Sequence, residues 1–132
     1  MSDEALRDIL AIPGSRGILT TLKRDGRPQL SVVFHHWDAA TSTLSISVTD
    51  DRAKTRNLRR DPRASYLVIG ATPWQYVVAE ADAHLGEVTR DAHDGAADDL
   101  VALYRALGGE HPDWAEFRAA MVAQQRLVLR LH

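Results

Sequence analysis

Alternating hydrophobic and polar residues run through most of the chain and predict six antiparallel strands. The clearest signal is a hairpin, because Asp25-Gly26 supplies the positive φ angles of a tight turn between two alternating segments. The fifth segment is long for a strand, and we expect a bulge near Glu80-Ala81 to interrupt it. The expected strands span residues 17–22, 27–37, 43–48, 64–69, 74–88 and 126–131.

Helical periodicity predicts short helices that flank these strands. An apolar face over residues 6–10 indicates an N-terminal helix, which Pro13-Gly14 ends. Apolar residues recur at i, i+3, i+4 and i+7 over residues 100–107 and predict a second helix. An acidic cap at Asp113 predicts a third helix over residues 114–122.

The order of these elements predicts an α+β fold, in which a barrel-like antiparallel sheet carries short flanking helices. Residues 1–132 contain no βαβ pattern, internal repeat or linker, so we expect a single domain. The short helices cannot cover a whole sheet, and a chain of this size often shares its binding cleft with a second copy. We therefore expect a homodimer.

A concentrated basic segment, residues 52–63, holds six of the sixteen lysine and arginine residues. It follows a strand and Asp50-Asp51, and we expect it to form a capped helix. Arg52, Lys54 and Thr55 would then lie in the first turn, where backbone N–H groups and the helix dipole attract an anion. A guanidinium, an ammonium and a hydroxyl can converge on one phosphate, so the sequence predicts a phosphate site here.

Composition and charge narrow the possible functions. The formal net charge of −2 argues against a bulk nucleic-acid binder, because such proteins are usually basic overall. The chain has no cysteine and no apolar run of membrane-spanning length, so we expect a cytoplasmic protein without disulfides or membrane contact. His35 and His36 are adjacent on a strand and point to opposite faces, so they predict no metal site. The chain has no nucleophile–base pattern, Walker loop or dinucleotide fingerprint, so redox chemistry would have to come from a cofactor.

Several of these stretches together resemble one known family: residues 17–21, 25–31, 52–65 and 74–80. They are similar to the actinobacterial flavin/deazaflavin oxidoreductases, the PPOX class of the pyridoxamine-phosphate-oxidase-like split β-barrel superfamily. The similarity extends over nearly the whole chain. It implies a six-stranded split barrel of the FMN-binding type, with coenzyme F420 as the cofactor and FMN as the alternative.

The resemblance also implies roles for the basic helix. Arg52, Lys54 and Thr55 correspond to residues that hold the cofactor phosphate, in agreement with the phosphate site predicted from the sequence itself. Arg59 and Arg60 would contact the acidic oligoglutamate tail of the deazaflavin cofactor. Surface charge, or an ion pair with a neighbouring carboxylate, is an equally good interpretation of these two arginines.

A second group of residues is implied to surround the flavin-like ring. Gln29 and Ser31 share one face of a strand that hydrogen-bonds the ring in the family, and Ser47 lies on the next strand. The solvent side of an amphipathic strand is the alternative for these polar residues. Trp74 resembles an aromatic that reaches the ring from the other subunit, and Tyr76 lies two residues beyond it; a core tryptophan is the alternative.

The expected activity is an F420-dependent reduction, in which hydride passes from the reduced deazaflavin to an electron-poor organic acceptor. An enone, a quinone, a tetrapyrrole or an aromatic xenobiotic would fit, and no residue selects among them. No catalytic acid is assigned. Two alternatives remain: an FMN-dependent oxidase or reductase on the same fold, and a carrier protein that binds F420 or flavin without turnover.

Overall fold

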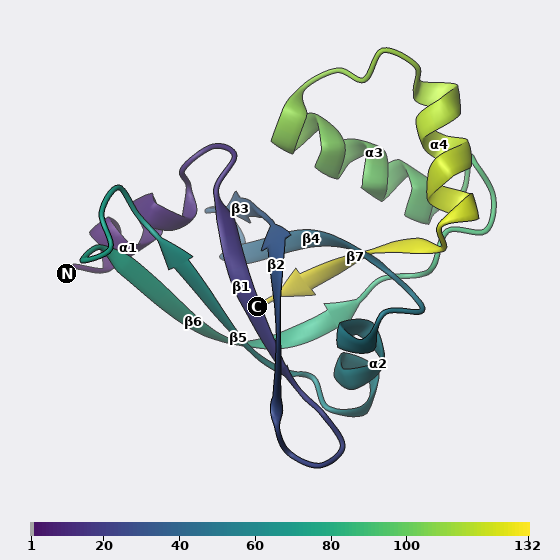
Figure 1. Cartoon of the computed structure of the whole chain (residues 1–132). Helices are drawn as coiled ribbons and strands as arrows, with labels where there is room; N and C mark the ends of the chain where they lie inside the picture. The colour runs from purple at the N-terminus through teal and green to yellow at the C-terminus, as the bar shows by residue number, and fades with distance from the viewer. Residues whose placement is uncertain (1) are drawn as a thin grey trace.

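The computed structural model describes residues 2–132, and this range contains four helices and seven strands (Figure 1). In chain order they are α1 (Asp3–Leu10), β1 (Arg16–Leu22), β2 (Pro28–Phe34), β3 (His36–Asp38), β4 (Thr43–Thr49), α2 (Ala53–Arg60), β5 (Arg63–Ile69), β6 (Tyr76–Leu85), α3 (Gly95–Gly108), α4 (Trp114–Ala123) and β7 (Arg126–Leu131).

The strands form one antiparallel sheet in the order β2-β1-β5-β6-β7-β4-β3. Strands β2 and β3 lie at opposite edges of the sheet, yet His35 alone separates them along the chain. The sheet must therefore curl until its edges meet, as Figure 1 shows. Helix α2 contacts β1 and β6, whereas α3 and α4 pack together beside β7. This curled sheet with flanking helices confirms the predicted α+β fold.

The strand count differs from the six expected, because the expected strand 27–37 is divided at His35. Strand β2 pairs with β1, whereas β3 pairs with β4, so the chain changes partner at this residue. The bulge expected near Glu80-Ala81 is also wrong. Strand β6 keeps a continuous register with β5 over residues 76–82 and then pairs with β7 from Ala83. The long segment thus bends by changing its partner and needs no inserted residue.

The predicted helices α1, α3 and α4 are confirmed, and α3 and α4 each start after an aspartate cap. The side chain of Asp94 accepts a hydrogen bond from the backbone of Ala97, and Asp113 accepts one from Glu116. Hydrogen bonds from the backbone N–H groups of Arg90 and Ala97 are the main reason why the pKa of Asp94 is lowered to about 2. None of the helices within residues 2–132 is long and apolar enough to cross a membrane.

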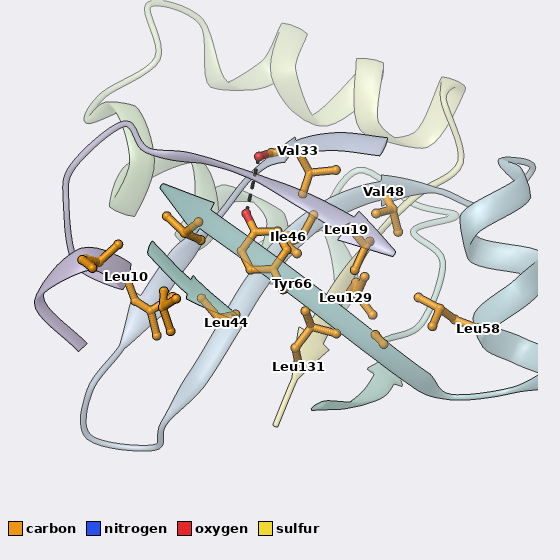
Figure 2. Packing of buried hydrophobic residues seen from close by; sticks show 14 of the residues in the cluster. Leu10, Leu19, Val33, Leu44, Ile46, Val48, Leu58, Tyr66, Leu129 and Leu131 are labelled. Carbon is orange, nitrogen blue, oxygen red and sulfur yellow. Dashed lines mark hydrogen bonds between the residues drawn. The ribbon is translucent and has the colours of Figure 1, made fainter. Parts of the chain in front are cut away.

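Tyr66 occupies the centre of the core, where its fully buried ring is surrounded by aliphatic side chains such as Leu19, Ile46 and Leu129 (Figure 2). The ring lies directly against Gly17. A Cβ atom on that glycine would be 2.2 Å from Cζ of Tyr66, which is far inside van der Waals contact. Only glycine at this position of β1 leaves room for the tyrosine.

His35 connects this core to α1. Its Nε2 lies 2.9 Å from the carbonyl oxygen of Leu10 and therefore carries the proton that makes this hydrogen bond. Its Nδ1 then accepts from the Tyr66 hydroxyl at 2.7 Å. Burial is the largest cause that lowers the pKa of His35, and the nearby His36 lowers it further. The folded protein therefore favours a neutral imidazole at this position.

This environment predicts a pH dependence of stability. Because the pKa of His35 is lowered in the folded state, the unfolded chain binds the extra proton first as the pH falls below about 6.5. The free energy of unfolding should therefore decrease below that pH, whereas above it the stabilising contribution of neutral His35 is fully present. Urea unfolding of the parent and of His35→Gln at several pH values measures the effect, and the variant should lack this part of the pH dependence. A His36→Gln variant that loses as much of it would contradict the assignment.

Candidate functional site

Helix α2 begins without a side-chain cap. Arg52 is its N-cap residue and makes no capping hydrogen bond, and the first turn contains no acidic residue. The expected cap from Asp50 or Asp51 is therefore wrong, because Asp50 instead pairs with Arg59 in the last turn of the same helix. The first turn of α2 thus combines its dipole with positively charged side chains, and this combination favours a bound anion.

A cleft of about 370 Å³ opens beside this helix start. Its lining combines apolar side chains with positively charged ones, and no carboxylate occurs among the described residues that line it. The lining residues are Val32, Val33 and Phe34 of β2, Ser47, Val48 and Thr49 of β4, Arg52 and Lys54 of α2, Leu107 of α3 and Arg126 of β7.

Three cations of the lining, Arg52, Lys54 and Arg126, lie close to one another, and we call this part of the cleft its charged end. Burial is the main cause that lowers the pKa of Lys54, and the charges of Arg52 and Arg126 lower it further. Burial and the charge of Arg52 also lower the pKa of Arg126. These groups repel one another without a counter-charge in the cleft, so an anion bound between them would relieve the repulsion.

Thr55 does not line the cleft. Thr55, predicted to bind the phosphate, is fully buried, and its hydroxyl donates to the carbonyl oxygen of Thr49 at 2.7 Å. Its hydroxyl therefore stabilises the β4–α2 corner. Thr49 itself lines the cleft, and its Oγ1 is buried without a hydrogen-bond partner among the described residues. Ser47, which the resemblance placed near the ring, lines the cleft, and its Oγ accepts a hydrogen bond from Nη1 of Arg126 at 3.2 Å.

Gln29 and Ser31 share one face of β2, as predicted, and that face points inward. The carboxamide oxygen of Gln29 accepts from Asn57 of α2 at 2.9 Å, so this side chain ties β2 to the helix. Ser31 Oγ is buried and has no hydrogen-bond partner among the described residues. Neither side chain lines the cleft within one chain.

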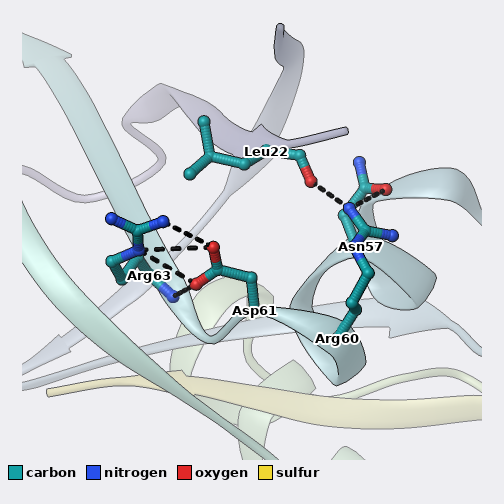
Figure 3. A network of polar contacts seen from close by, with 5 residues as sticks. All are labelled: Leu22, Asn57, Arg60, Asp61 and Arg63. Carbon is teal, nitrogen blue, oxygen red and sulfur yellow. Dashed lines mark hydrogen bonds and ion pairs between the residues drawn. The ribbon is translucent and has the colours of Figure 1, made fainter. Parts of the chain in front are cut away.

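The arginines at the end of α2 point away from the cleft. Arg60 donates to the carbonyl oxygen of Leu22 and lies 3.4 Å from Oδ1 of Asn57 (Figure 3). The neighbouring carboxylate of Asp61 forms an ion pair with Arg63. The hydrogen bond that the Arg63 side chain donates in this pair is the main cause that lowers the pKa of Asp61 to about 2. A second cavity, of about 480 Å³, is lined by Arg24, Ala53, Arg56, Asn57, Arg59 and Arg60.

The outward-facing residues of β2 reverse the usual pattern of a half-buried strand. Leu30, Val32 and Phe34 are 60%, 68% and 55% exposed, whereas polar side chains point inward. The strand register extends this apolar surface across four strands, and we call it the outer sheet face. It comprises Ile18, Leu30, Val32, Phe34, Leu67, Ile69, Tyr76 and Val78.

Tyr76 belongs to the outer sheet face, and Trp74 precedes it by two residues in the chain. Trp74 occupies the β5–β6 connection and is 87% exposed, so the alternative of a core tryptophan is wrong. Neither aromatic residue lines the cleft of its own chain. Val32 and Phe34 belong to both surfaces, so the cleft opens at the edge of the outer sheet face.

The sequence analysis assigned Ser47, Arg52 and Lys54 to the site but missed the seven other described residues that line the cleft, among them Phe34, Thr49, Leu107 and Arg126. Arg126 begins the last strand, far along the chain from α2, and only the pairing of β4 with β7 brings it to the helix start. Leu107 continues the apolar face of α3, which predicted a helix but not the cleft beneath it. No cluster of three or more candidate metal ligands occurs within residues 2–132.

Comparison with known proteins agrees with this arrangement. A structure described as an F420 reductase is 21% identical, with a TM-score of 0.68 over 93% of this chain and 89% of that chain. A heme storage protein from Vibrio cholerae is 17% identical, with a TM-score of 0.68 over 98% and 88% of the two chains. An FMN-binding protein from Nostoc punctiforme, related to pyridoxamine 5′-phosphate oxidase, is 15% identical, with a TM-score of 0.63 over 98% and 75%.

The sequence itself gives the family. Residues 2–132 match the family model described as pyridoxamine 5′-phosphate oxidase, which covers all of the chain that the structure describes. The resemblance to PPOX-class proteins is therefore confirmed. The chain belongs to the pyridoxamine 5′-phosphate oxidase family and has the split-barrel fold of its PPOX class.

Proposed function

We propose that the cleft beside α2 binds coenzyme F420 and that the protein is an F420-dependent reductase of an electron-poor organic molecule. The observation that carries this proposal is the lining of the cleft, which combines the cations Arg52, Lys54 and Arg126 with apolar side chains such as Phe34. A phosphorylated flavin-type cofactor has matching parts, with a phosphate at one end and a flat ring at the other.

The cleft fits such a group in a second respect. The Thr49 hydroxyl is buried without a partner, and a buried hydroxyl is costly unless a hydrogen bond satisfies it. Arg52 and Lys54 would hold the phosphate, while Val32, Phe34 and Leu107 would exclude water from the ring. When bound, reduced F420 supplies the hydride, and the chain contributes binding, orientation and shielding.

FMN is the second candidate, because it also carries a phosphate on a ribityl chain. A flavin-type cofactor is supported by relatives of the same fold whose descriptions name F420 or FMN. Heme is less well supported, although one relative is described as a heme storage protein. A heme iron needs an axial ligand such as histidine, and no histidine, methionine or tyrosine is among the described residues that line the cleft.

The test is a titration of the purified protein with F420, with FMN and with hemin, followed by fluorescence and by the Soret band. Tight binding of F420 and hydride transfer to a quinone or enone would support the proposal. Tight FMN binding alone would favour the flavin enzyme, and F420 binding without turnover would favour a carrier. If the protein binds neither F420 nor FMN tightly, the reductase, the flavin enzyme and the carrier are all refuted.

The site is further proposed to lie in a homodimer. The outer sheet face exposes more apolar side chains than an isolated chain of this size usually leaves in water. A second copy that covers this face would bury it and would approach the open edge of the cleft at Val32 and Phe34. The side chain of Trp74 would then be able to pack against the ring that the other subunit binds.

Arg59 is proposed to contact the glutamate tail, and this role predicts a dependence on tail length and on salt. Its guanidinium is partly exposed and paired with Asp50, so a tail carboxylate would have to replace that partner. Arg59→Ala should weaken binding of long-tailed F420 and leave FMN binding unchanged. The effect should fade as salt is added, because exposed charges are screened. Equal losses for both cofactors at all salt concentrations would contradict this role.

A further inference from the structure

Arg126 is held in a fixed position at the charged end of the cleft. Its Nε donates to Oε1 of Gln124 at 2.8 Å, and its Nη1 donates to Oγ of Ser47 at 3.2 Å. A guanidinium has five N–H donors, so these two bonds leave several for another acceptor. None of the ion pairs within residues 2–132 includes Arg126.

Thr49 lies directly opposite Arg126 in the pairing of β4 with β7. Directly paired residues project from the same face of a sheet, with Cβ atoms about 5 Å apart. The carbonyl oxygen of Thr49 accepts from Thr55, but its own hydroxyl is buried and unpartnered. Both residues line the cleft, and each has at least one donor without a partner among the described residues.

We propose that the Thr49–Arg126 pair completes the anion site of Arg52 and Lys54, and that the completed site takes a phosphoryl group carrying or adjoining a second negative charge. This inference rests on the proposed function. Three cations without a carboxylate retain a net charge of about two after one monoanion binds, so a second negative charge gains further stabilisation. A phosphomonoester dianion has this chemistry, and so has a phosphodiester beside a carboxylate.

A purely structural role for Arg126 makes the opposite prediction for the ligand-free protein. If the bond to Gln124 mainly held the turn between α4 and β7, removal of the guanidinium would lower the melting temperature. If Arg126 is an anion ligand, its removal relieves repulsion with Arg52 and Lys54, and the melting temperature should stay constant or rise. Thr49→Val should likewise not destabilise the ligand-free protein, because it removes an unsatisfied hydroxyl at nearly constant volume.

The experiment compares thermal unfolding of the parent, Arg126→Gln and Thr49→Val with inorganic phosphate, a dianion at pH 8, and with dimethyl phosphate, a monoanion. The parent should be stabilised more by inorganic phosphate. Each variant should need about tenfold more phosphate for the same shift, since a charge-assisted hydrogen bond is lost. Arg63→Gln, which removes one charge from the ion pair with Asp61 outside the cleft, is the matched control and should respond like the parent.

A phosphate response that is unchanged in both variants would overturn the inference. The inference is also overturned if Arg126→Gln has a lower melting temperature than the parent and keeps the parent's phosphate response. If Arg126→Gln does not fold, the phosphate response of Thr49→Val is the deciding result. The affinities of Arg126→Gln for FMN and for F420 then identify the source of the second charge. The cofactor that loses more affinity is the one whose second charge contacts Arg126. If phosphate binding depends on both residues but neither cofactor binds, the inference stands and the proposed function fails. If both cofactors bind the parent and the variants equally well, the inference fails and the function stands.

Discussion

Replacement of Lys54 by alanine is expected to lower the affinity for the cofactor about ten- to a hundredfold and to leave the fold intact. The ammonium lies in the cleft at the first turn of α2, so its removal deletes a charge-assisted contact worth about 1.5–3 kcal/mol. The free energy of unfolding should not fall, because burial, and then the charges of Arg52 and Arg126, lower the pKa of Lys54 and so disfavour its charged form in the folded, ligand-free protein. Fluorescence titration gives the affinity, and urea unfolding of the ligand-free variant tests the fold.

Arg52→Ala is expected to behave in the same way, because it removes a neighbouring cation from an exposed N-cap position. Arg24→Ala is the matched control, since Arg24 lines the second cavity beside α2 and is not among the described residues that line the cleft. If both Lys54→Ala and Arg52→Ala bind the cofactor as the parent does, the phosphate site must lie elsewhere. Equal losses in Arg24→Ala would instead indicate a long-range effect of net charge.

Local signals were sufficient for most of the elements. The Asp25-Gly26 hairpin and the helices that begin after Asp94 and Asp113 are confirmed, because turn chemistry and capping act within a few residues. The basic helix is confirmed as well, although its expected aspartate cap is absent. Each of these features depends on side chains that lie next to one another in the sequence.

Features that depend on pairing between distant strands could not be predicted in this way. The alternation around His35 continues without a visible break, but that residue marks the point where the chain crosses between the two edges of the sheet. The inverted polarity of β2 is a second example, because alternation shows that two faces differ and not which face is buried.

The residues of the candidate site also differ in whether a local pattern or the pairing of distant strands places them. Arg52 and Lys54 could be predicted because they share a helix start with each other and with its dipole. Thr55 was assigned to the phosphate from its place in the first turn, yet its hydroxyl is turned inward to the Thr49 carbonyl. The contribution of Arg126 depends on the register of β4 with β7, which no local pattern in the sequence encodes.

Complementation between two inactive chains is the strongest effect expected of a shared site. Trp74 is highly exposed and does not line the cleft of its own chain, whereas Lys54 does, so the two residues can act on one cofactor only across a dimer. Homodimers of Lys54→Ala and of Trp74→Ala should both bind poorly. A mixed dimer places both substitutions in one site and leaves the other site intact, so an equimolar mixture should regain tight binding at a fraction of its sites.

The measurement is the number of tight cofactor sites per chain after the two variants are unfolded together and refolded. Random pairing makes about half of the dimers mixed, each with one intact site, so about a quarter of all sites should bind tightly. Each variant refolded alone is the control and should show none. Val78→Asp, which buries a charge if the outer sheet face is an interface, should abolish dimers and tight binding together. A mixture without recovery, or a monomer in sedimentation that binds the cofactor fully, would show that the site belongs to one chain.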